Sequence, residues 1–447
     1  MKRLFIVTAV LLGLSVISFS QEKSWSLDDC ISYALENNIS LKRQELNTEI
    51  NKKDFTQSKL NALPNLNGQV THNMGSGRVL DEGTYEYLNT DITQGALGLG
   101  SNVTLFNGLT GYNTMKMMEA NYLASRENLE LFENNLLMQV MTGYLDLLRK
   151  IELYEIALEK VKVTDLQVER MEMIKEVGNA SEGELLEVKA QASAEKYNMI
   201  LSKNQVDVAK LSLMHLLNLQ TESGFEITKP EIEDPNQLQI PDLDIVYQTA
   251  LAILPQIKSA EHNIDYFNKN LAVSRGALSP EIFARALYNS RYNNLALNPR
   301  DPADAYPYDL QVVDNRFTQI SLGVTVPIFN RWQGRTNISK AKIGLQDAKY
   351  NLEDAKQQLL KEIQQYYTDA LAALENYEAA GESTENSEEA YRYTEEKFKV
   401  GMGTALELEE ARNRLFASRA EMISAKYVFV FYAKILDFYQ GKDISFQ

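Results

Sequence analysis

Apolar residues recur along two long stretches of the chain at the spacing of packed helices. In the stretch at about 113–177, which contains no proline, they are separated by alternating steps of three and four residues. A helix of that length would be roughly 98 Å long, more than a single globular core can cover. A second apolar row lies beside the first, so we predict a helix that packs on two flanks. The two rows consist of Leu137, Val140, Tyr144, Leu147, Ile151, Tyr154, Leu158 and Val161, and of Met141, Leu145 and Leu148.

The second stretch, at about 335–400, repeats this pattern. Its apolar row consists of Leu352, Ala355, Leu359, Ile363, Tyr366, Ala370, Ala373 and Tyr377. A shorter helix is predicted after each long one, at about 182–219 and 405–439. Two more helices, at about 27–60 and 244–271, would stack end to end on the shorter ones, so that two short helices span the length of one long helix.

Four segments loosely alternate apolar with polar residues, which predicts strands. They lie at about 66–74, 97–106, 282–292 and 318–328. Their length suits tilted transmembrane strands, although on alternation alone a small soluble sheet fits equally well. Four strands cannot close a barrel, and an open edge in a bilayer leaves backbone groups unsatisfied. A membrane-spanning arrangement therefore requires several chains to pool their strands.

The same strand-to-helix turn occurs twice. The stretch "VTLFNGLTG" contains Phe106 and Asn107, and "VTVPIFNRWQGR" contains Phe329 and Asn330, 223 residues later. Upstream the offset is 216, so the second copy carries seven extra residues, in a Pro-, Asp- and Asn-rich segment at 293–311 that we interpret as a surface loop. We predict two structural repeats, 21–226 and 227–447.

Composition and targeting signals limit the class of protein. Residues 1–20, with Lys2 and Arg3 before an apolar run, predict a secretory signal peptide. Cys30 lies too far downstream to be a lipidation site, and as the only cysteine it excludes an intrachain disulfide. No later stretch has the ~18 to 20 apolar residues of a membrane-spanning helix. The formal net charge of −16 argues against binding to nucleic acid.

With these features the chain resembles the TolC-type outer-membrane efflux protein family. The resemblance rests on the entry segment "SLDDCISYALENN", on the turns at Phe106, Asn107 and Gly108 and at Phe329 and Asn330, and on the duplicated stretches "EVGNASEGELLEVKAQ" and "KVGMGTALELEEARNR". It implies a mainly α chain with a small β part. Three chains would pool four strands each into a 12-stranded β-barrel in outer-membrane lipid. Long antiparallel coiled-coil helices would continue the barrel as an α-helical tunnel across the periplasm. Each Phe-Asn turn would lie where a strand ends and a helix begins.

The resemblance also assigns the ends of the long helices. Glycines at the two helix ends are free to adopt the positive φ of a helix-ending turn. The family implies that these tips contact a periplasmic adaptor protein. The candidate contact residues are Val177, Gly178, Ser181, Val400, Gly401 and Thr404.

Two pairs of acidic residues follow the tips. Glu407 and Glu410, and likewise Glu184 and Glu187, are three apart and so share one helix face, which most often means a solvated surface. The family places acidic residues at the closed end of the tunnel, which makes these four the candidate pore constriction. In a symmetric trimer such carboxylates would raise one another's pKa and favour cations. Gly403 and Phe398 stand where the family's locking links use Arg and Tyr, so any lock must use other contacts.

Catalysis and cofactors are not expected. His72, His215 and His262 are scattered without the spacing of metal ligands, and no phosphate-binding loop or nucleophile elbow is present. We therefore predict a passive exit duct for small molecules that docks onto an adaptor and an inner-membrane pump. The alternatives are an exit channel for type I protein secretion and a soluble periplasmic coiled-coil scaffold.

Overall fold

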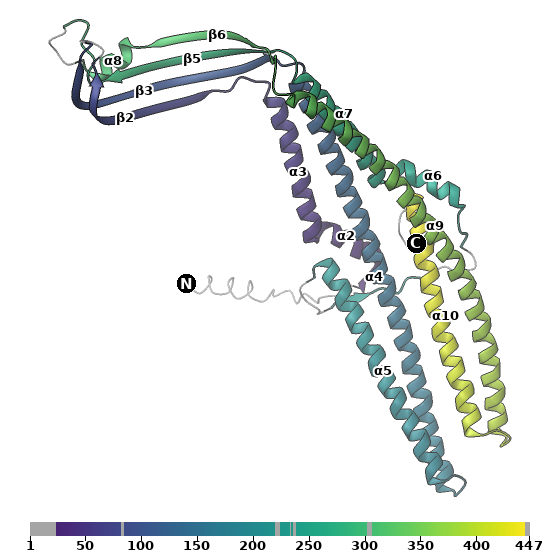
Figure 1. Cartoon of the computed structure of the whole chain (residues 1–447). Coiled ribbons are helices and arrows are strands. Elements are labelled where there is room, and N and C mark those ends of the chain that lie inside the picture. The colour runs from purple at the N-terminus through teal and green to yellow at the C-terminus, as the bar shows by residue number, and fades with distance from the viewer. Residues whose placement is uncertain are drawn as a thin grey trace, which may run out of the picture. The chain divides into compact units, whose positions relative to one another are not determined.

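The computed structural model describes residues 24–81, 85–219, 224–232, 234–235, 238–301 and 306–442 (Figure 1). The predicted signal peptide, 1–20, lies outside these residues. The chain forms two compact units. Unit 1 comprises Met1–Gln44, Leu129–Leu254 and Lys356–Gln447, and unit 2 comprises Glu45–Asn128 and Pro255–Ala355. Each unit thus draws on both predicted repeats.

Four helices follow the predicted long-and-short pattern. The long helices are α4 (Thr110–Glu176) and α9 (Gln333–Lys399), each of 67 residues. They are followed by α5 (Glu182–Leu217) and α10 (Ala405–Tyr439). The predicted fold class, mainly α with a small β part, is confirmed. Within the described residues, no helix is long and apolar enough to cross a membrane.

The helices before the strand pairs are each interrupted, so the prediction of one continuous helix in each repeat was wrong. The first forms α2 (Leu27–Asn37) and α3 (Ile39–Leu60), and the second forms α6 (Leu243–Ile253) and α7 (Pro255–Gly276). Asn38 breaks the first because its side chain accepts the N–H groups of Ser40 and Leu41. Leu254 breaks the second because a residue before proline is disfavoured in helical conformation.

Within unit 1, α2 lies against α5 and α6 lies against α10. The side-chain amide of Asn38 donates to the carbonyl oxygen of Leu216 in α5 at 3.1 Å. Helix α6 likewise contacts α10. The contacts agree with the predicted stacking of two short helices along one long helix.

The apolar rows of the long helices are largely buried. In α4 the second row, Met141, Leu145 and Leu148, is fully inside, so this helix packs on two flanks as predicted. Tyr144 is also buried, and its hydroxyl donates to the carbonyl oxygen of Thr228 at 2.6 Å, next to the short parallel strands β1 (Ser24–Trp25) and β4 (Glu226–Ile227). In α9 the buried members of the predicted row are Leu359, Ile363, Ala370, Ala373 and Tyr377.

Unit 2 contains one antiparallel sheet, in which the strands lie side by side in the order β2-β3-β5-β6 (Figure 1). The strands are β2 (Asn67–Leu80), β3 (Tyr87–Phe106), β5 (Glu281–Asn293) and β6 (Phe317–Thr325). The first two are longer than the predicted 66–74 and 97–106. The Gly- and Ser-containing segment 75–80, which lay outside the predicted strand, is paired in register with 87–92.

The two faces of this sheet differ in polarity. Register partners project to the same face. One face carries exposed apolar side chains, namely Val70, Met74, Leu97, Leu99, Tyr288, Ile320, Leu322 and Val324. The opposite face carries polar side chains, among them Gln69, Asn73, Asn102, Arg285, Asn289 and Gln319. The sheet is therefore amphipathic, with its apolar face open to the surroundings.

The extra segment of the second repeat, at 293–311, was interpreted from its composition as a surface loop. This interpretation was wrong in part, because the segment runs into a helix. This helix, α8 (Tyr308–Asp314), packs against β5. Gln311 is 1% exposed; its side chain accepts the N–H of Asn293 and donates to the carbonyl oxygen of the same residue. One buried amide thus extends the backbone pairing of β5 and fixes α8 in place.

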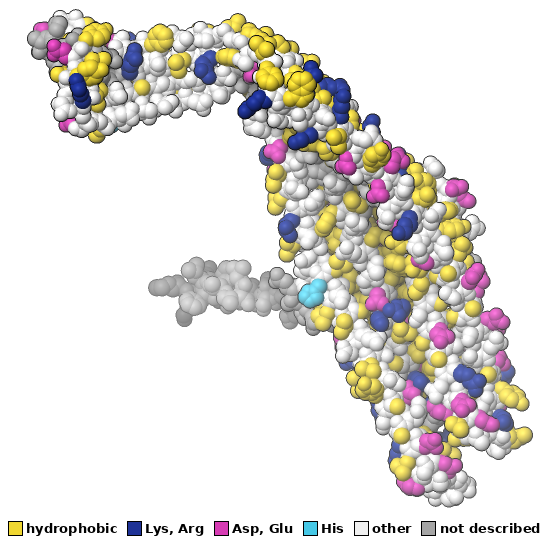
Figure 2. All heavy atoms as spheres, in the orientation of Figure 1, with side chains coloured by type: hydrophobic (Ala, Val, Ile, Leu, Met, Phe, Trp, Pro, Cys, Tyr) yellow, Lys and Arg dark blue, Asp and Glu magenta, His cyan; other side chains and the backbone are white. Residues whose placement is uncertain are grey.

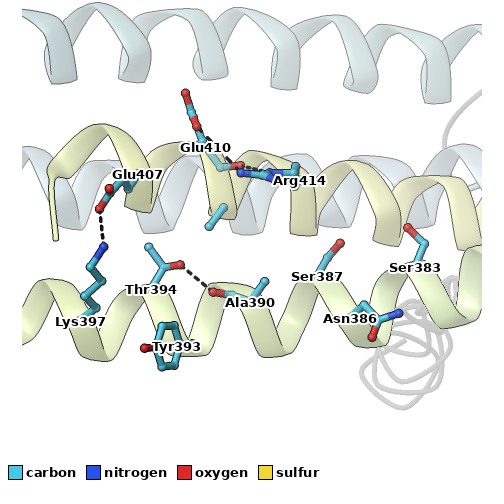
Figure 3. Close-up of a pocket in the computed structure, with 11 residues that line it drawn as sticks. Ser383, Asn386, Ser387, Ala390, Tyr393, Thr394, Lys397, Glu407, Glu410 and Arg414 are labelled. Atoms are coloured by element: carbon cyan, nitrogen blue, oxygen red, sulfur yellow. Dashed lines mark hydrogen bonds and ion pairs between the residues drawn. The ribbon is translucent and has the colours of Figure 1, made fainter.

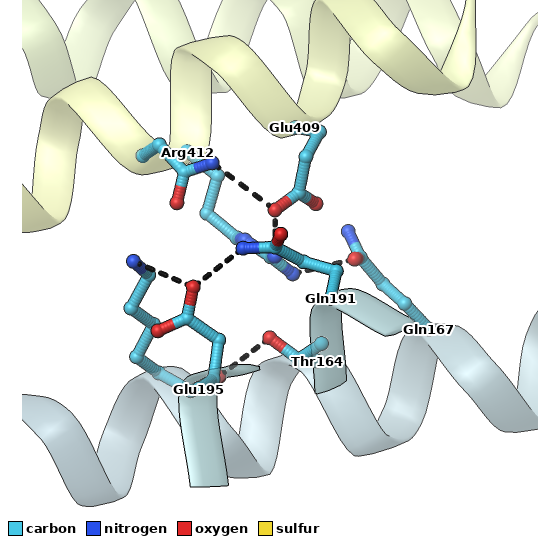
Figure 4. A network of polar contacts seen from close by, with 8 residues as sticks. Thr164, Gln167, Gln191, Glu195, Glu409 and Arg412 are labelled. Carbon is cyan, nitrogen blue, oxygen red and sulfur yellow. Dashed lines mark hydrogen bonds and ion pairs between the residues drawn. The ribbon is translucent and has the colours of Figure 1, made fainter. Parts of the chain in front are cut away.

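A buried polar network in unit 1 ties the first repeat to the second (Figure 4). Arg412 of α10 is fully buried, and its guanidinium donates to Glu409 on the same helix and to Gln167 on α4. Close by, Glu195 of α5 is 4% exposed and accepts from Lys160 of α4 at 2.9 Å. The pairing with Glu409 offsets part of the cost of burying the Arg412 charge, although its Nε–H has no hydrogen-bond partner among the described residues.

This network gives a stability prediction. Arg412→Met should lower the free energy of unfolding by about 1 to 3 kcal/mol, because Gln167 and the partly exposed Glu409 each lose a hydrogen-bond donor. Thermal unfolding of the detergent-extracted protein measures the effect. Adding Glu409→Met should recover much of the loss.

The matched control is Arg414→Met on the same helix. Its side chain is 74% exposed and lies 3.9 Å from Glu410, so its removal should cost well under 1 kcal/mol. If the two single variants unfold at the same temperature, the network does not fasten the repeats.

Candidate functional site

Both long helices end in the same turn. Gly178 has a φ of +81° and Gly401 a φ of +77°. In each case the glycine N–H donates to the carbonyl three residues back, and the next N–H donates to the carbonyl five residues back. No atom would lie within 4 Å of a Cβ added at either glycine. Glycine is therefore favoured by backbone conformation and not by lack of space.

The helix after each tip begins with the same reciprocal cap. The side chains of Ser181 and Thr404 accept the N–H of Glu184 and Glu407 at 3.2 Å. In return, Glu184 accepts the N–H of Ser181 at 2.7 Å and Glu407 accepts the N–H of Thr404 at 3.1 Å. This capping box satisfies backbone donors at the start of α5 and α10. Two of the predicted acidic site residues thus have a structural task.

Capping also sets the protonation of these two carboxylates. The backbone N–H of Thr404, followed by the side chain of Lys397, lowers the pKa of Glu407 below its usual value. The hydrogen bonds from Ser181 lower the pKa of Glu184 in the same way. Within one chain the direction is opposite to that expected for a ring of carboxylates. Any repulsion in an assembly would act on groups that start ionised.

Glu407 and Glu410 line a polar groove between α9 and α10 (Figure 3). The groove has a volume of about 530 Å³. Lys397 of α9 lies 3.3 Å from the Glu407 carboxylate, and Arg414 lies beside Glu410. Tyr393, 74% exposed, is at the same groove. Glu407, Glu410 and Arg414 lie on α10, and Lys397 pairs with Glu407 from α9.

A second cavity, of about 380 Å³, lies between the two tips. It brings together Glu184, Glu187 and Glu410, three of the four predicted acidic residues, although they come from different repeats. Glu409 adds a fourth carboxylate, and Arg170 is the basic residue of the lining. Apolar residues, among them Met171, Phe398 and Leu406, form much of the remaining wall.

The tips also expose apolar side chains. Val177 is 71% and Val400 68% exposed, while the hydroxyls of Ser181 and Thr404 are used in the caps. Next to Val400, Met402 is 74% exposed. Apolar side chains held on an ordered turn are typical of a surface that another protein covers.

The strand-to-helix turns are built alike in both repeats. Gly108 and Leu109 both have positive φ values, and so do Arg331 and Trp332 at the equivalent positions 223 residues later. A Cβ at Gly108 would lie 2.4 Å from the carbonyl oxygen of Gly276, so this copy requires glycine.

The asparagines of these turns have a local role. Asn107 accepts the N–H of Gly111 at 3.2 Å, and Asn330 accepts the N–H of Gly334 at 3.4 Å. Each therefore helps to start the following helix. Phe106 and Phe329 remain 42% and 75% exposed.

Sequence reasoning missed Arg412 and Lys397. Arg412 follows Leu408 by four residues and precedes Leu415 by three, so it occupies a core position of the coiled coil. A charged residue in an apolar row was a signal for a buried pair. No comparable signal existed for Lys397, because its partner Glu407 lies across the tip turn.

The chain resembles known proteins both in sequence and in fold. The family model described as outer membrane efflux protein matches residues 30–219 and 246–429. The outer membrane efflux protein BepC of Brucella suis biovar 1 (strain 1330) is 22% identical over 424 residues, which cover 94% of this chain and 86% of the relative.

Solved structures share the fold. The Campylobacter jejuni CmeC outer membrane channel matches with a TM-score of 0.77 and 17% identity, covering 93% of this chain and 85% of that one. The outer membrane protein VceC from Vibrio cholerae matches with a TM-score of 0.76 and 15% identity, covering 93% and 96%. The two segments matched by the family model lie one in each predicted repeat and make up most of the sequence, and the chain therefore belongs to the outer membrane efflux protein family.

Proposed function

We propose that three copies of this chain form a passive exit duct, which docks through its tips onto a periplasmic adaptor and an inner-membrane pump. Members of the family are outer-membrane efflux channels, which favours the duct over a soluble scaffold. The duct itself would only conduct, and the pump would supply the energy. Small molecules are the expected cargo.

The amphipathic sheet carries this proposal. Strands β2 and β6 are its outer strands, so each has one edge without a partner among the described residues. In lipid an open edge leaves backbone N–H and C=O groups unsatisfied. Because the strands alternate in direction, β6 of one copy would run antiparallel to β2 of the next. Three copies would then close a ring of twelve strands with the apolar face outward.

The helices support association along their length as well. Helix α5 has a row of exposed apolar side chains, namely Tyr197, Ile200, Leu201 and Val208. A helix that exposes such a row in the single chain is expected to pack against another one. The row would bury against the neighbouring copy in the trimer.

The tips would serve both docking and selectivity. Val177, Val400 and Met402 offer an apolar surface to an adaptor. The cavity that contains Glu187 and Glu410 would lie at the periplasmic mouth, where three copies would concentrate carboxylates. Such a mouth would attract cations.

Strand pooling can be tested by cross-linking. In a background of Cys30→Ser, which removes the only cysteine, cysteines at facing sites on β2 and β6 should link neighbouring copies, and the ladder should stop at three chains. A scan that combines Val70→Cys with a cysteine at Ile320, Leu322 or Val324 covers the possible registers. Denaturing electrophoresis measures the ladder.

The control pairs Leu99→Cys with Tyr288→Cys, register partners on β3 and β5 of one chain. This pair should link within the chain and give no ladder. A monomer throughout the β2 and β6 scan, or a ladder that continues past three, would contradict the proposed trimer.

The acidic mouth gives a second prediction. Glu187→Gln combined with Glu410→Gln should lower the cation preference of the channel severalfold, because it removes two carboxylates per chain and leaves both capping boxes intact. Reversal potentials in planar bilayers with a KCl gradient measure the effect. It should weaken at high salt, where charges are screened.

Glu421→Gln is the control, an exposed residue farther along α10. It should leave the preference unchanged. If the double variant behaves like this control, Glu187 and Glu410 lie on solvated helix faces and do not form a selectivity site.

A further inference from the structure

In unit 2, basic residues collect where four helices meet the sheet. The segments 52–62, 107–119, 269–281 and 329–342 contain ten Lys and Arg but three Asp and Glu. They hold the end of α3, the start of α4, the end of α7 and the start of α9, and we call them the basic collar. Figure 2 shows dark blue side chains gathered over these helix ends. This excess stands out because the whole chain has a formal net charge of −16.

The collar segments are close to one another in space. A Cβ at Gly108 would lie 2.4 Å from the carbonyl oxygen of Gly276, and one at Gly334 would lie 2.4 Å from Leu278. The starts of α4 and α9 therefore both pack against the end of α7. Three of the four collar segments are thus adjacent, and the end of α3 lies next to α4, where the rings of Phe55 and Tyr122 stack.

The turn before α9, at the edge of the basic collar, exposes large apolar side chains. Ile328 is 92%, Phe329 75% and Trp332 59% exposed. The Arg335 guanidinium lies 4.3 Å from the centroid of the Trp332 ring, in a cation–π arrangement. Within the described residues, neither Arg331 nor Arg335 forms an ion pair. A tryptophan beside free cations is typical of a membrane–water boundary.

The backbone of this turn is strained. Arg331 and Trp332 have φ values of +54° and +66°, a conformation that residues other than glycine rarely adopt. The first repeat has Gly108 at the position of Arg331. Arg331 thus stands where glycine would be relaxed, and backbone strain of this kind often occurs at functional sites.

The apolar face of the sheet leads directly to this turn. Leu322 and Val324 of β6 lie on that face, and Ile328 follows within a few residues. The surface thus changes from apolar strand to aromatic residues to arginines along one short segment. A lipid has this order of chemistry, with acyl chains first and a phosphate headgroup next. An acidic protein partner would match the arginines but not the apolar strand.

We propose that the basic collar, with Arg331, Trp332 and Arg335 at its centre, binds headgroups of anionic phospholipids in the leaflet next to the helices. This inference rests on the proposed membrane-spanning sheet. Each basic residue near an anionic surface contributes about fivefold in binding, the equivalent of ~1 kcal/mol. The collar would fix the depth of the strands in the bilayer and select the lipids around the duct.

Competition between two lipids tests the site. The full-length protein is placed in nanodiscs of equal phosphatidylcholine and phosphatidylglycerol and then extracted in mild detergent, and retained lipids are counted by native mass spectrometry. The wild type should retain phosphatidylglycerol over phosphatidylcholine by well over an order of magnitude, since two arginines alone contribute about 25-fold. Arg331→Gln with Arg335→Gln should reduce this preference by about an order of magnitude.

The matched control is Lys349→Gln with Lys361→Gln, which removes the same charge from exposed positions on α9. These residues lie 14 or more positions past Arg335, roughly 20 Å along the helix and beyond the ~8 Å Debye length. This control should keep the lipid preference. Arg331→Gly should raise the unfolding temperature, because it relieves the strained φ, yet lower the preference about fivefold.

Each result decides a separate point. Protein that enters nanodiscs but retains both lipids equally overturns the collar site alone, as does an equal loss in the double variant and its control. Protein that fails to enter nanodiscs overturns the membrane-spanning sheet. If inorganic phosphate displaces phosphatidylglycerol at equal free concentration, the site is a general anion site and the lipid assignment is wrong.

Discussion

The structure depends on one constraint, which is that each helix of 67 residues carries apolar rows through its middle and must bury them against neighbouring helices. Among the described helices only α4 and α9 have that length, so shorter helices pack against them. The bond from Asn38 to Leu216 joins two such short helices. On another flank, the buried Arg412 reaches from α10 to α4. A four-helix arrangement held in this way still leaves the apolar row of α5 exposed, which is why we infer further copies.

The tips show how two of the candidate pore residues take part in folding. Glu184 and Glu407 occupy the third position of a helix and accept backbone N–H groups, which keeps them ionised. Glu187 and Glu410 have no capping role. Members of both kinds line the cavities, because Glu184 lies in the cavity with Glu187 and Glu410, and Glu407 lies in the groove with Glu410.

Charge is distributed unevenly between the two compact units. The tips in unit 1 gather carboxylates, whereas the collar in unit 2 gathers Lys and Arg in an otherwise acidic chain. Carboxylates suit a mouth that receives cations, and free arginines beside an exposed Trp332 suit a phosphate-bearing surface. At the duplicated turn, the second copy has Arg331 where the first copy has Gly108, which adds to the positive charge of unit 2.

The sequence by itself determined the order of the main elements and the length of the two long helices. Apolar spacing predicted both long helices within about three residues, because a coiled-coil row is a repeated local signal, and the 223-residue offset identified paired turns and tips. Only the tertiary structure decided which groups meet across elements. It extended β2 over a glycine-rich segment, because pairing with β3 outweighs turn propensity. It also formed α8 around the buried Gln311, and it placed Glu187 and Glu410 in one cavity. These outcomes depend on contacts between residues distant in the chain, which no local pattern records.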